Sequence, residues 1–375
     1  MKSRSSKLVG WCRRAVLLTL VLCLPAGAVE VPTLFTAEVL LDKEAENPRA
    51  DAYDAALREI LMRVSGSAIA ENEEAIAELF PDPSSYVMQF RPGADDSLWV
   101  SFDGEAIERV LRGAGQTFWG SERPLTLVWL AVDWGQGTRE IIAAGDPERS
   151  QDEARSIDRN RLLRERLLEI SERRGLPVVF PLLDTTDLQS VTFSDIWGGF
   201  DEAILYASER YDAKSILIGR IRPSSGQRSR WTYYFTGARS ELSGAPEAVV
   251  GQVADLLSAE FAVGGDAPLE AVVLNVSGVA SVDAYGSVQQ ILKDMSLIEG
   301  FALKEVAGDR VSYRVEIRGG ADRLSRALRF NGLVEQEPPQ GPSQDPFQDP
   351  SQDPFQDPPQ DPLQDADVLE FYFSP

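Results

Sequence analysis

Histidine is absent from the chain, and its two cysteines, Cys12 and Cys23, both lie within the first 28 residues. If those residues form a cleaved leader, the mature protein has neither a thiol nor an imidazole. Such a protein cannot form disulfide bonds, Cys–His nucleophile pairs, thiolate or imidazole metal sites, or covalent haem attachments. The chemistry that remains is that of carboxylates, hydroxyls, lysine and oxygen ligands, and we predict no cofactor.

Positive charge is also scarce. The sequence has 37 Lys and Arg against 59 Asp and Glu, which gives a formal net charge of −22. Removal of the leader, which carries five bases and no acid, would change this charge to −22 − 5 = −27. A chain this acidic would repel nucleic acids and anionic membrane surfaces. We therefore expect a partner that is not a nucleic acid.

The first 28 residues have the three-part pattern of a cleavable secretory signal peptide. A basic stretch (2–14) precedes an apolar run (15–24), which is followed by Pro25 and three small residues. We predict cleavage after Ala28. The apolar run is about half of the ~20 residues that a membrane-spanning helix needs, and no later apolar run is long enough. The mature protein is therefore expected outside the cytoplasm, with no transmembrane segment.

Two other interpretations of the leader are less favoured. Lipid attachment at Cys23 would require small residues before it, but larger apolar residues stand at 20–22. The pair Arg13-Arg14 is compatible with twin-arginine export of folded cargo, but no cofactor motif supports that route. The general secretory route is therefore preferred.

The remaining sequence alternates between strand and helix patterns and predicts an α+β or α/β fold of three small units. Residues 29–123 are predicted as an N-terminal α+β unit of order βαββα, and residues 124–264 as a central α/β unit. Residues 265–334 together with 367–375 are predicted as a C-terminal ferredoxin-like unit of order βαββαβ. Residues 335–366 are predicted as a disordered, acidic, Pro-rich insertion.

The central unit has the strongest alternation. Residues 125–132 are uniformly apolar, which predicts a central strand that is buried on both faces. Helical spacing then alternates with strand patterns, which favours parallel strands joined by crossover helices. The predicted helices cover 157–174, 201–211 and 246–261, and the predicted strands cover 177–183, 215–221 and 231–235.

The end of the chain carries two contrasting patterns. Gln-Asp-Pro motifs recur at a period of four from Gln344 to Pro362. Proline at that spacing excludes helix and sheet, and aspartate keeps such a segment hydrated. Beyond the motifs, Leu369, Phe371 and Phe373 recur at every second position, as in a strand. We predict that this strand returns to complete the C-terminal sheet and that the motifs form an inserted loop.

Three acids are placed where an α/β sheet would bind a ligand. Asp133 follows the first central strand, and Asp184 and Asp187 follow the next one. Ligands gather at the carboxyl ends of such strands, and an enzyme without histidine or cysteine would most simply use two carboxylates, as glycoside hydrolases do. The alternative, which we favour, is that these acids cap turns or helices. We assign no catalytic or metal-binding residue.

Tryptophans are better candidates for recognition. Trp119 and Arg123 precede the first central strand, Trp134 follows it, and Trp197 lies in a Gly-rich turn. Exposed tryptophans with a nearby arginine are typical of protein contact surfaces. Packing inside the core is the favoured alternative, because tryptophan is usually well buried. The candidate interaction residues are thus Trp119, Arg123, Asp133, Trp134, Asp184 and Trp197.

Several segments carry a resemblance when they are taken together. They are residues 53–66 ending in Arg-Val-Ser-Gly, the hairpin before Phe102-Asp103, the stretch Trp119-Gly-Ser-Glu-Arg-Pro with 127–132, and residues 211–220. As a set they resemble a proteobacterial family, the domain of unknown function number two thousand and sixty-six. The resemblance implies an exported, periplasmic protein of the Gram-negative cell envelope with no established activity.

The middle unit has a second, more distant resemblance through Tyr211-Asp-Ala and Leu217-Ile-Gly-Arg. These residues are similar to the α/β domain of the TolB N-terminal region, curli secretion lipoproteins and penicillin-binding-protein activators. That similarity implies a binding or assembly role by analogy of fold alone. The present chain lacks the acylated cysteine of the lipoprotein members, so it gives no support to a membrane tether.

Two functional classes remain open. The favoured one is a non-catalytic periplasmic binding or assembly module that contacts another envelope protein. The alternative is a carboxylate-dependent hydrolase that acts on cell-wall glycan.

Overall fold

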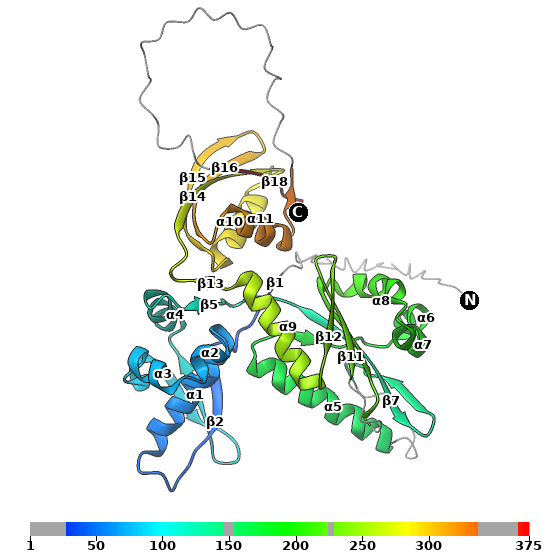
Figure 1. The fold of residues 1–375 in the computed structure, drawn as a ribbon. Coiled ribbons are helices and arrows are strands. Elements are labelled where there is room, and N and C mark those ends of the chain that lie inside the picture. Colours follow the sequence, from blue (N-terminus) through cyan, green and yellow to red (C-terminus); the bar gives the residue numbers. More distant parts are fainter. Residues whose placement is uncertain (1–27, 146–153, 224–228, 337–366, 375) are drawn as a thin grey trace, which may run out of the picture.

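A computed structural model describes residues 28–145, 154–223, 229–336 and 367–374. These residues form a mixed α and β fold with several small sheets, which confirms the predicted fold class (Figure 1). The predicted leader, apart from Ala28, and almost all of the predicted disordered insertion lie outside the described residues. Ala28 itself is the first residue of strand β1 (Ala28–Glu30), which pairs with β6 (Glu122–Pro124).

The N-terminal part of the fold is a three-stranded antiparallel sheet covered by helices. Its long helix α1 has Pro at its first position, where the missing N–H costs no hydrogen bond. Tyr53, Leu57, Ile60 and Leu61 lie on the buried face of this helix, as their spacing predicts. The strands, in the order β2-β4-β3, and the helices are β2 (Thr36–Leu40), β3 (Val87–Pro92), β4 (Ser97–Phe102), α1 (Pro48–Val64), α2 (Ser67–Ala70), α3 (Glu73–Leu79) and α4 (Gly104–Gly113).

The central sheet is built around β7 (Thr126–Gly135), the strand predicted from its uniformly apolar sequence. At its start β7 lies between the parallel strands β9 (Val178–Val179) and β10 (Ser215–Ile221), and it is buried from Thr126 to Asp133. Its side chains alternate between two cores: Val128 and Leu130 face one side of the sheet, and Leu127 and Trp129 face the other. The sheet has the order β12-β11-β10-β7-β8, and its other strands are β8 (Thr138–Ile141), β9 (Val178–Val179), β10 (Ser215–Ile221), β11 (Arg230–Phe235) and β12 (Ala238–Ser243).

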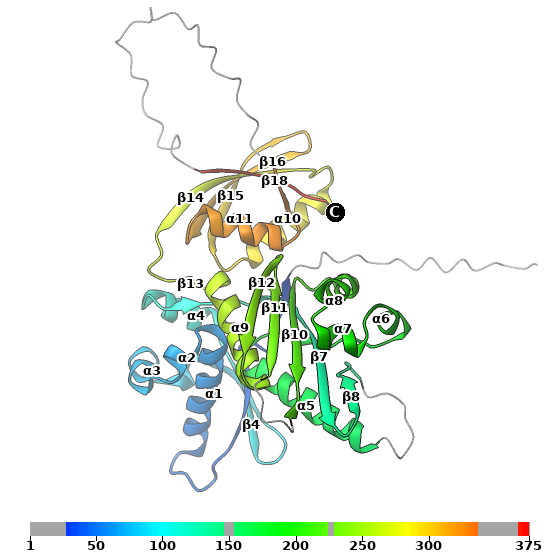
Figure 2. The same ribbon diagram turned by 45° about the vertical axis from the view of Figure 1, so that its right-hand side comes forward.

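Helices cover both faces of the central sheet (Figure 2). One face packs against α5 (Ala154–Arg173) and α9 (Pro246–Phe261), and the other against three short helices. The predicted strand at 177–183 is only two residues long, because Pro177 and Pro181 lack the N–H that a sheet requires. The short helices are α6 (Thr185–Ser190), α7 (Phe193–Gly198) and α8 (Asp201–Ser208).

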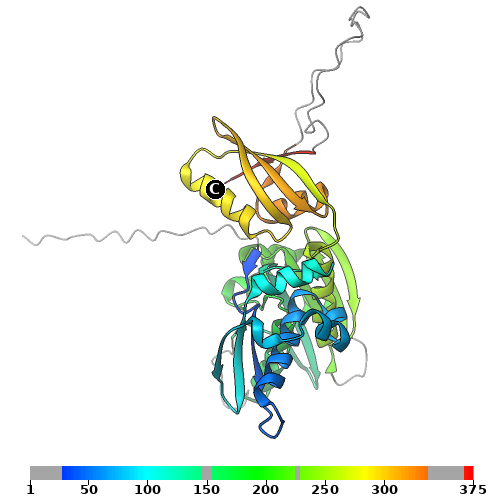
Figure 3. The ribbon, with the colours of Figure 1, turned by 90° about the vertical axis from the view of Figure 1, so that its left-hand side faces the viewer.

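The C-terminal sheet lies above the rest of the fold in all three ribbon views (Figure 3). Its strand order is β15-β16-β14-β18-β17. Strand β18 runs parallel to β14, so the end of the chain completes this sheet as predicted. The elements are β14 (Leu269–Ser277), α10 (Val282–Asp294), β15 (Ile298–Ala307), β16 (Arg310–Arg318), α11 (Ala321–Phe330), β17 (Val334–Glu335) and β18 (Val368–Tyr372).

Arg123 connects the N-terminal helices to the central sheet. Its side chain is fully buried, and its five N–H groups donate to five backbone carbonyls at 2.8–3.2 Å. Carbonyls at helix ends lack partners within the helix and carry partial negative charge, so a guanidinium satisfies them well. The acceptors come from the last turn of α1, from the two residues after α5 and from the short segment before β6: Arg63, Arg174, Gly175, Trp119 and Gly120.

Gly175 is part of the same arrangement. Its φ of +61° favours glycine, and a Cβ at this position would lie 2.5 Å from an Arg123 nitrogen. The Arg123 guanidinium also stacks on the Trp119 ring at 4.0 Å. Burial, with help from the charges of Arg63 and Arg174, lowers the pKa of Arg123 to about 9, which still leaves it charged at neutral pH.

Replacement of Arg123 should therefore destabilise the whole protein. Arg123→Met leaves five buried carbonyls without a donor, and we expect a loss of at least about 3 kcal/mol in the free energy of unfolding in urea. Arg123→Lys supplies three donors from a single point and should lose about 1–3 kcal/mol. The exposed Arg314 offers a matched control, Arg314→Met, with an expected change within about 0.5 kcal/mol. Equal effects at the two positions would contradict this role for Arg123.

The C-terminal strand β18 should be necessary for the stability of the C-terminal sheet. Phe371 is fully buried within β18, so Phe371→Ala should lower the free energy of unfolding by about 3–5 kcal/mol. Tyr372→Ala, on the more exposed neighbouring residue, should cost about 0.5 kcal/mol. Deletion of residues 367–375 should lower the melting temperature, and an unchanged melting curve would refute the contribution of this strand.

Candidate binding site

Several of the predicted interaction residues meet at the carboxyl ends of β7 and β10. Asp133 and Trp134 lie near the end of strand β7, and Trp197 comes from α7. Arg222, just after β10, contacts both Asp133 and Trp197. The edge at which parallel strands end is where α/β sheets bind ligands. We call these four residues, together with Arg139, Arg159, Asn160 and Phe193, the carboxyl-edge cluster.

Asp133 is the charged centre of the carboxyl-edge cluster. One carboxylate oxygen lies 2.7 Å from Arg222 Nη2 and 3.6 Å from Arg139 Nε, and the other accepts the backbone N–H of Gly135 at 3.0 Å. The residue as a whole is only 6% exposed. The hydrogen bonds from Arg222 and Gly135 and the two arginine charges lower the pKa of Asp133. Asp133 is thus a fixed anion that positions cations.

The arginines of the cluster also lie over aromatic rings. Arg222 lies 5.3 Å from the ring of Trp197, Arg139 lies 5.9 Å from the ring of Phe193, and both are close enough for cation–π attraction. Asp133 therefore positions two arginines, each of which lies over an aromatic side chain of α7.

Trp134 is held in a similar way from α5. Arg159 lies 5.0 Å from its ring, and the indole N–H donates to Asn160 Oδ1 at 3.0 Å. Asn160 in turn donates to Glu140 at 2.8 Å. The ring orientation is thereby set from both its face and its edge.

A groove of about 1230 Å³ borders this cluster between α5, the end of β10 and the start of α9. Trp134, Arg159 and Arg222 line one part of it, and Arg166 and Leu162 line another. Leu162 is 61% exposed and adds apolar surface to the groove. The groove therefore combines apolar, aromatic and cationic groups, although Glu165 and Glu169 also contribute to its wall.

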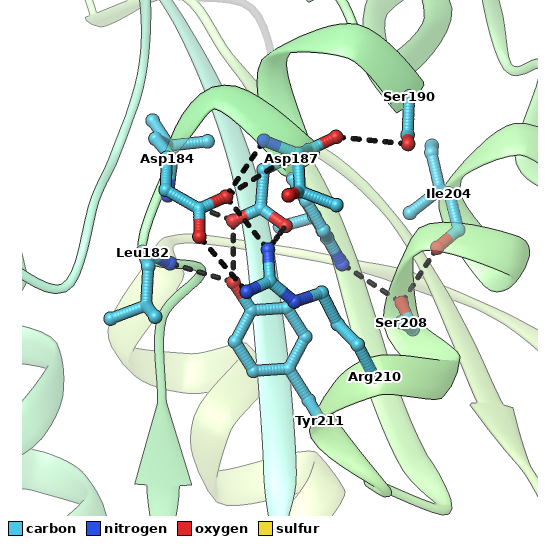
Figure 4. A network of polar contacts seen from close by, with 11 residues as sticks. Leu182, Asp184, Asp187, Ser190, Ile204, Ser208, Arg210 and Tyr211 are labelled. Atoms are coloured by element: carbon cyan, nitrogen blue, oxygen red, sulfur yellow. Dashed lines mark hydrogen bonds and ion pairs between the residues drawn. The ribbon is translucent and has the colours of Figure 1, made fainter. Parts of the chain in front are cut away.

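Asp184 and Asp187 belong to a separate, closed network with Arg210 and Tyr211 (Figure 4). Asp184 caps the start of α6. Its two carboxylate oxygens form a bidentate ion pair with the Arg210 guanidinium, at 2.7 and 2.9 Å. The fully buried Asp187 accepts from Arg210, the Tyr211 hydroxyl and the Leu183 amide at 3.0, 2.5 and 2.9 Å. Arg210 and the helix amides lower the pKa of Asp184 to about 2, and burial with the Asp187 contact raises the pKa of Tyr211 to about 12. This network joins α6 to the end of α8, which is a structural role.

The candidate interaction residues Trp119 and Arg123 are not at the surface, and Trp119 instead follows the favoured alternative of packing inside the core. Trp119 is 2% exposed and Arg123 is fully buried, because the guanidinium has to reach the ends of two helices. Asp184 does not join the cluster either, since it caps α6. Of the six residues predicted, the structure thus brings together Asp133, Trp134 and Trp197.

Sequence reasoning missed the cluster's arginines and Asn160. Arg222 could have been found from its position directly after the predicted strand 215–221, the same signal that identified Asp133. Arg139 and Arg159 carried no such signal, because each comes from a neighbouring element that only the folded chain brings to β7.

Two features are absent from the described part of the chain. None of its acidic residues gather in threes in a geometry that could hold a metal ion. None of its helices combines the length and apolar character that a membrane crossing requires.

Comparison with known proteins identifies one match. Residues 28–120 match a family described as a domain of unknown function (DUF8605). This supports the expectation of an uncharacterised domain but not the particular proteobacterial family that the sequence resembles. No curated protein and no solved structure matches the chain. The matched segment ends before β7, so it does not include the carboxyl-edge cluster.

The Asp184–Arg210 pair predicts a specific response to acid. The folded pKa of Asp184, about 2, is below the ordinary 3.8, so its contribution to stability is complete above pH 3.8 and is lost as the pH falls through about 2. Asp184→Asn should therefore be less stable than the original protein near neutral pH, and this difference should shrink between pH 3.8 and 2. Urea unfolding at several pH values measures it.

The control for this measurement is Glu305→Gln, at an exposed carboxylate of β15 that makes no ion pair within the described residues. We expect little change in stability from this substitution at any pH in that range. A difference between Asp184→Asn and the original protein that grows on acidification would contradict the assignment.

Proposed function

We propose that this chain is an exported, non-catalytic binding module of the bacterial cell envelope that holds a protein partner in the groove beside the carboxyl-edge cluster. The observation that carries the proposal is the set of arginine–aromatic pairs at the carboxyl edge of the central sheet. The partner segment is expected to carry acidic and apolar side chains, because the groove offers arginines beside Trp134 and Leu162.

The composition of the groove supports recognition of a protein. Trp and Arg are enriched at the energetically dominant positions of protein interfaces, where they combine a large apolar area with directed hydrogen bonds. Trp134 and Arg159 are oriented before any partner arrives, by their mutual contact and by Asn160. Side chains that are already ordered lose little conformational entropy on binding. These features favour a site that binds without rearrangement.

The ion pairs of the candidate acids favour a binding role over the alternative of a glycan hydrolase. Glycoside hydrolysis needs a carboxylic acid with a raised pKa to protonate the leaving group. Asp133 and Asp184 instead have lowered pKa values and ion pairs with arginines. Both oxygens of Asp187 accept hydrogen bonds inside the network. Asp133 and Asp184 are therefore ionised near neutral pH and supply no proton to a leaving group.

Site-specific photo-crosslinking in the envelope tests the proposed surface. A photoreactive residue in place of Leu162 should give one defined protein adduct, and Arg166→Glu in the same chain should reduce its yield several-fold by reversing a charge of the groove. The matched control is the same photoreactive residue at Leu303, which is 48% exposed on the distant strand β15 and should not give this adduct. Equal adducts at both positions, or none at Leu162, would refute the proposed surface.

The hydrolase alternative has its own test. Incubation of the purified protein with peptidoglycan should release no soluble fragments. Release that disappears in Asp133→Asn, with an unchanged melting temperature, would establish the hydrolase and overturn the proposal.

A further inference from the structure

A second cavity lies between the central and C-terminal parts of the fold. It is about 500 Å³ in volume and is formed where the end of α11 meets the ends of β11 and α9, the junction visible in Figure 2. Cavities of roughly 300–1,000 Å³ between structural units are typical of small-molecule sites. This junction cavity shares none of its lining residues with the groove beside the carboxyl-edge cluster.

Three phenylalanines form an apolar wall of the junction cavity. Phe235 ends β11, Phe261 ends α9 and Phe330 ends α11. Their ring centroids are 5.3–6.0 Å apart, so each ring contacts the other two. Edge and tilted contacts of this kind fix the rings relative to one another. A flat apolar group in the cavity would therefore meet a preformed surface made by both parts of the fold.

The polar lining of the junction cavity is mainly cationic. Lys214, Arg326 and Arg329 line it together with a single acid, Glu260. Glu260 forms an ion pair with Arg326, and Arg329 pairs with Glu335 at 3.2 Å. Lys214 makes no ion pair with any carboxylate in the described part of the chain. Three cations and one acid give the lining of this cavity a net positive charge, although the net charge of the whole chain is −22.

Lys214 is the cation best placed to hold a ligand. Its ammonium donates one hydrogen bond, to the Phe330 carbonyl at 2.9 Å, and lies 5.5 Å from the Phe330 ring. An ammonium has three N–H donors. Partial burial lowers the pKa of Lys214, and this effect outweighs the opposing influence of the Asp212 charge. An anion in the cavity would restore the lost solvation.

We infer that the junction cavity binds a small organic anion, in which a carboxylate, sulfonate or phosphate group is attached to an aromatic ring or a short apolar body. The anionic group would accept hydrogen bonds from Lys214, and the apolar body would pack on Phe235, Phe261 and Phe330. A neutral ligand would leave the ammonium uncompensated, and a cation would be repelled by it. Because the lining comes from two parts of the fold, the ligand would also strengthen the contact between them.

Fluorescence titration with anilinonaphthalene sulfonate, an aromatic anion, tests this inference on the full chain. We expect saturable binding at one site, and Lys214→Met should weaken it about ten-fold or more by removing a partly buried charge-assisted contact. Phe235→Leu should weaken it less, because it retains an apolar side chain. Arg222→Met, in the carboxyl-edge cluster, should leave the affinity unchanged, so the result does not depend on the proposed partner site.

A second measurement needs no variant and remains valid if Lys214→Met folds poorly. Benzoate should displace the probe from the original protein, whereas benzyl alcohol, of similar shape but uncharged, should require at least about ten-fold more ligand. Equal displacement by the two compounds would overturn the inference. So would an unchanged probe affinity in a Lys214→Met protein whose circular dichroism and melting temperature match those of the original.

Discussion

One buried guanidinium holds the first two parts of this fold together. Within the described part of the chain Arg123 has no carboxylate partner, and its donors are satisfied by backbone carbonyls, several of them at the ends of α1 and α5. A charge in this environment is tolerated only when every donor finds an acceptor. The positions of both helices relative to the central sheet therefore depend on this contact, and so does the wall of the groove that α5 provides.

Arginine has a second role at the surface of an otherwise acidic protein. Arg210 neutralises Asp184 and Asp187 within one network, and Arg222 neutralises Asp133 in another. Acids that looked available for chemistry are thus used to position cations. In the carboxyl-edge cluster those cations lie over Trp197 and Phe193, which gives the edge of the sheet an ordered surface. The junction cavity differs, because Lys214 forms no ion pair within the described residues and instead lies 5.5 Å from the Phe330 ring.

Much of the fold could be predicted because its signals are local. The apolar run that became β7, the helical stripe of α1 and the alternation at the C-terminal end are all visible in short windows of sequence. The short helices α6 and α7 were missed, since each has six residues and their stability comes from caps and packing. Part of the site was predicted for a similar reason: Asp133 and Trp134 follow directly from the end of a recognisable strand.

The sequence by itself determined the chemical inventory, the acidic charge and the elements that could form, because these depend on composition and on spacing within a few residues. Only the tertiary structure decided which tryptophans are buried and which arginine meets which acid. Trp119 and Trp134 look alike in sequence, but one stacks on a guanidinium inside the core and the other lines a groove. The physical reason is that burial and ion pairing depend on contacts between residues far apart in the chain, such as Arg222 and Asp133, that no local pattern encodes.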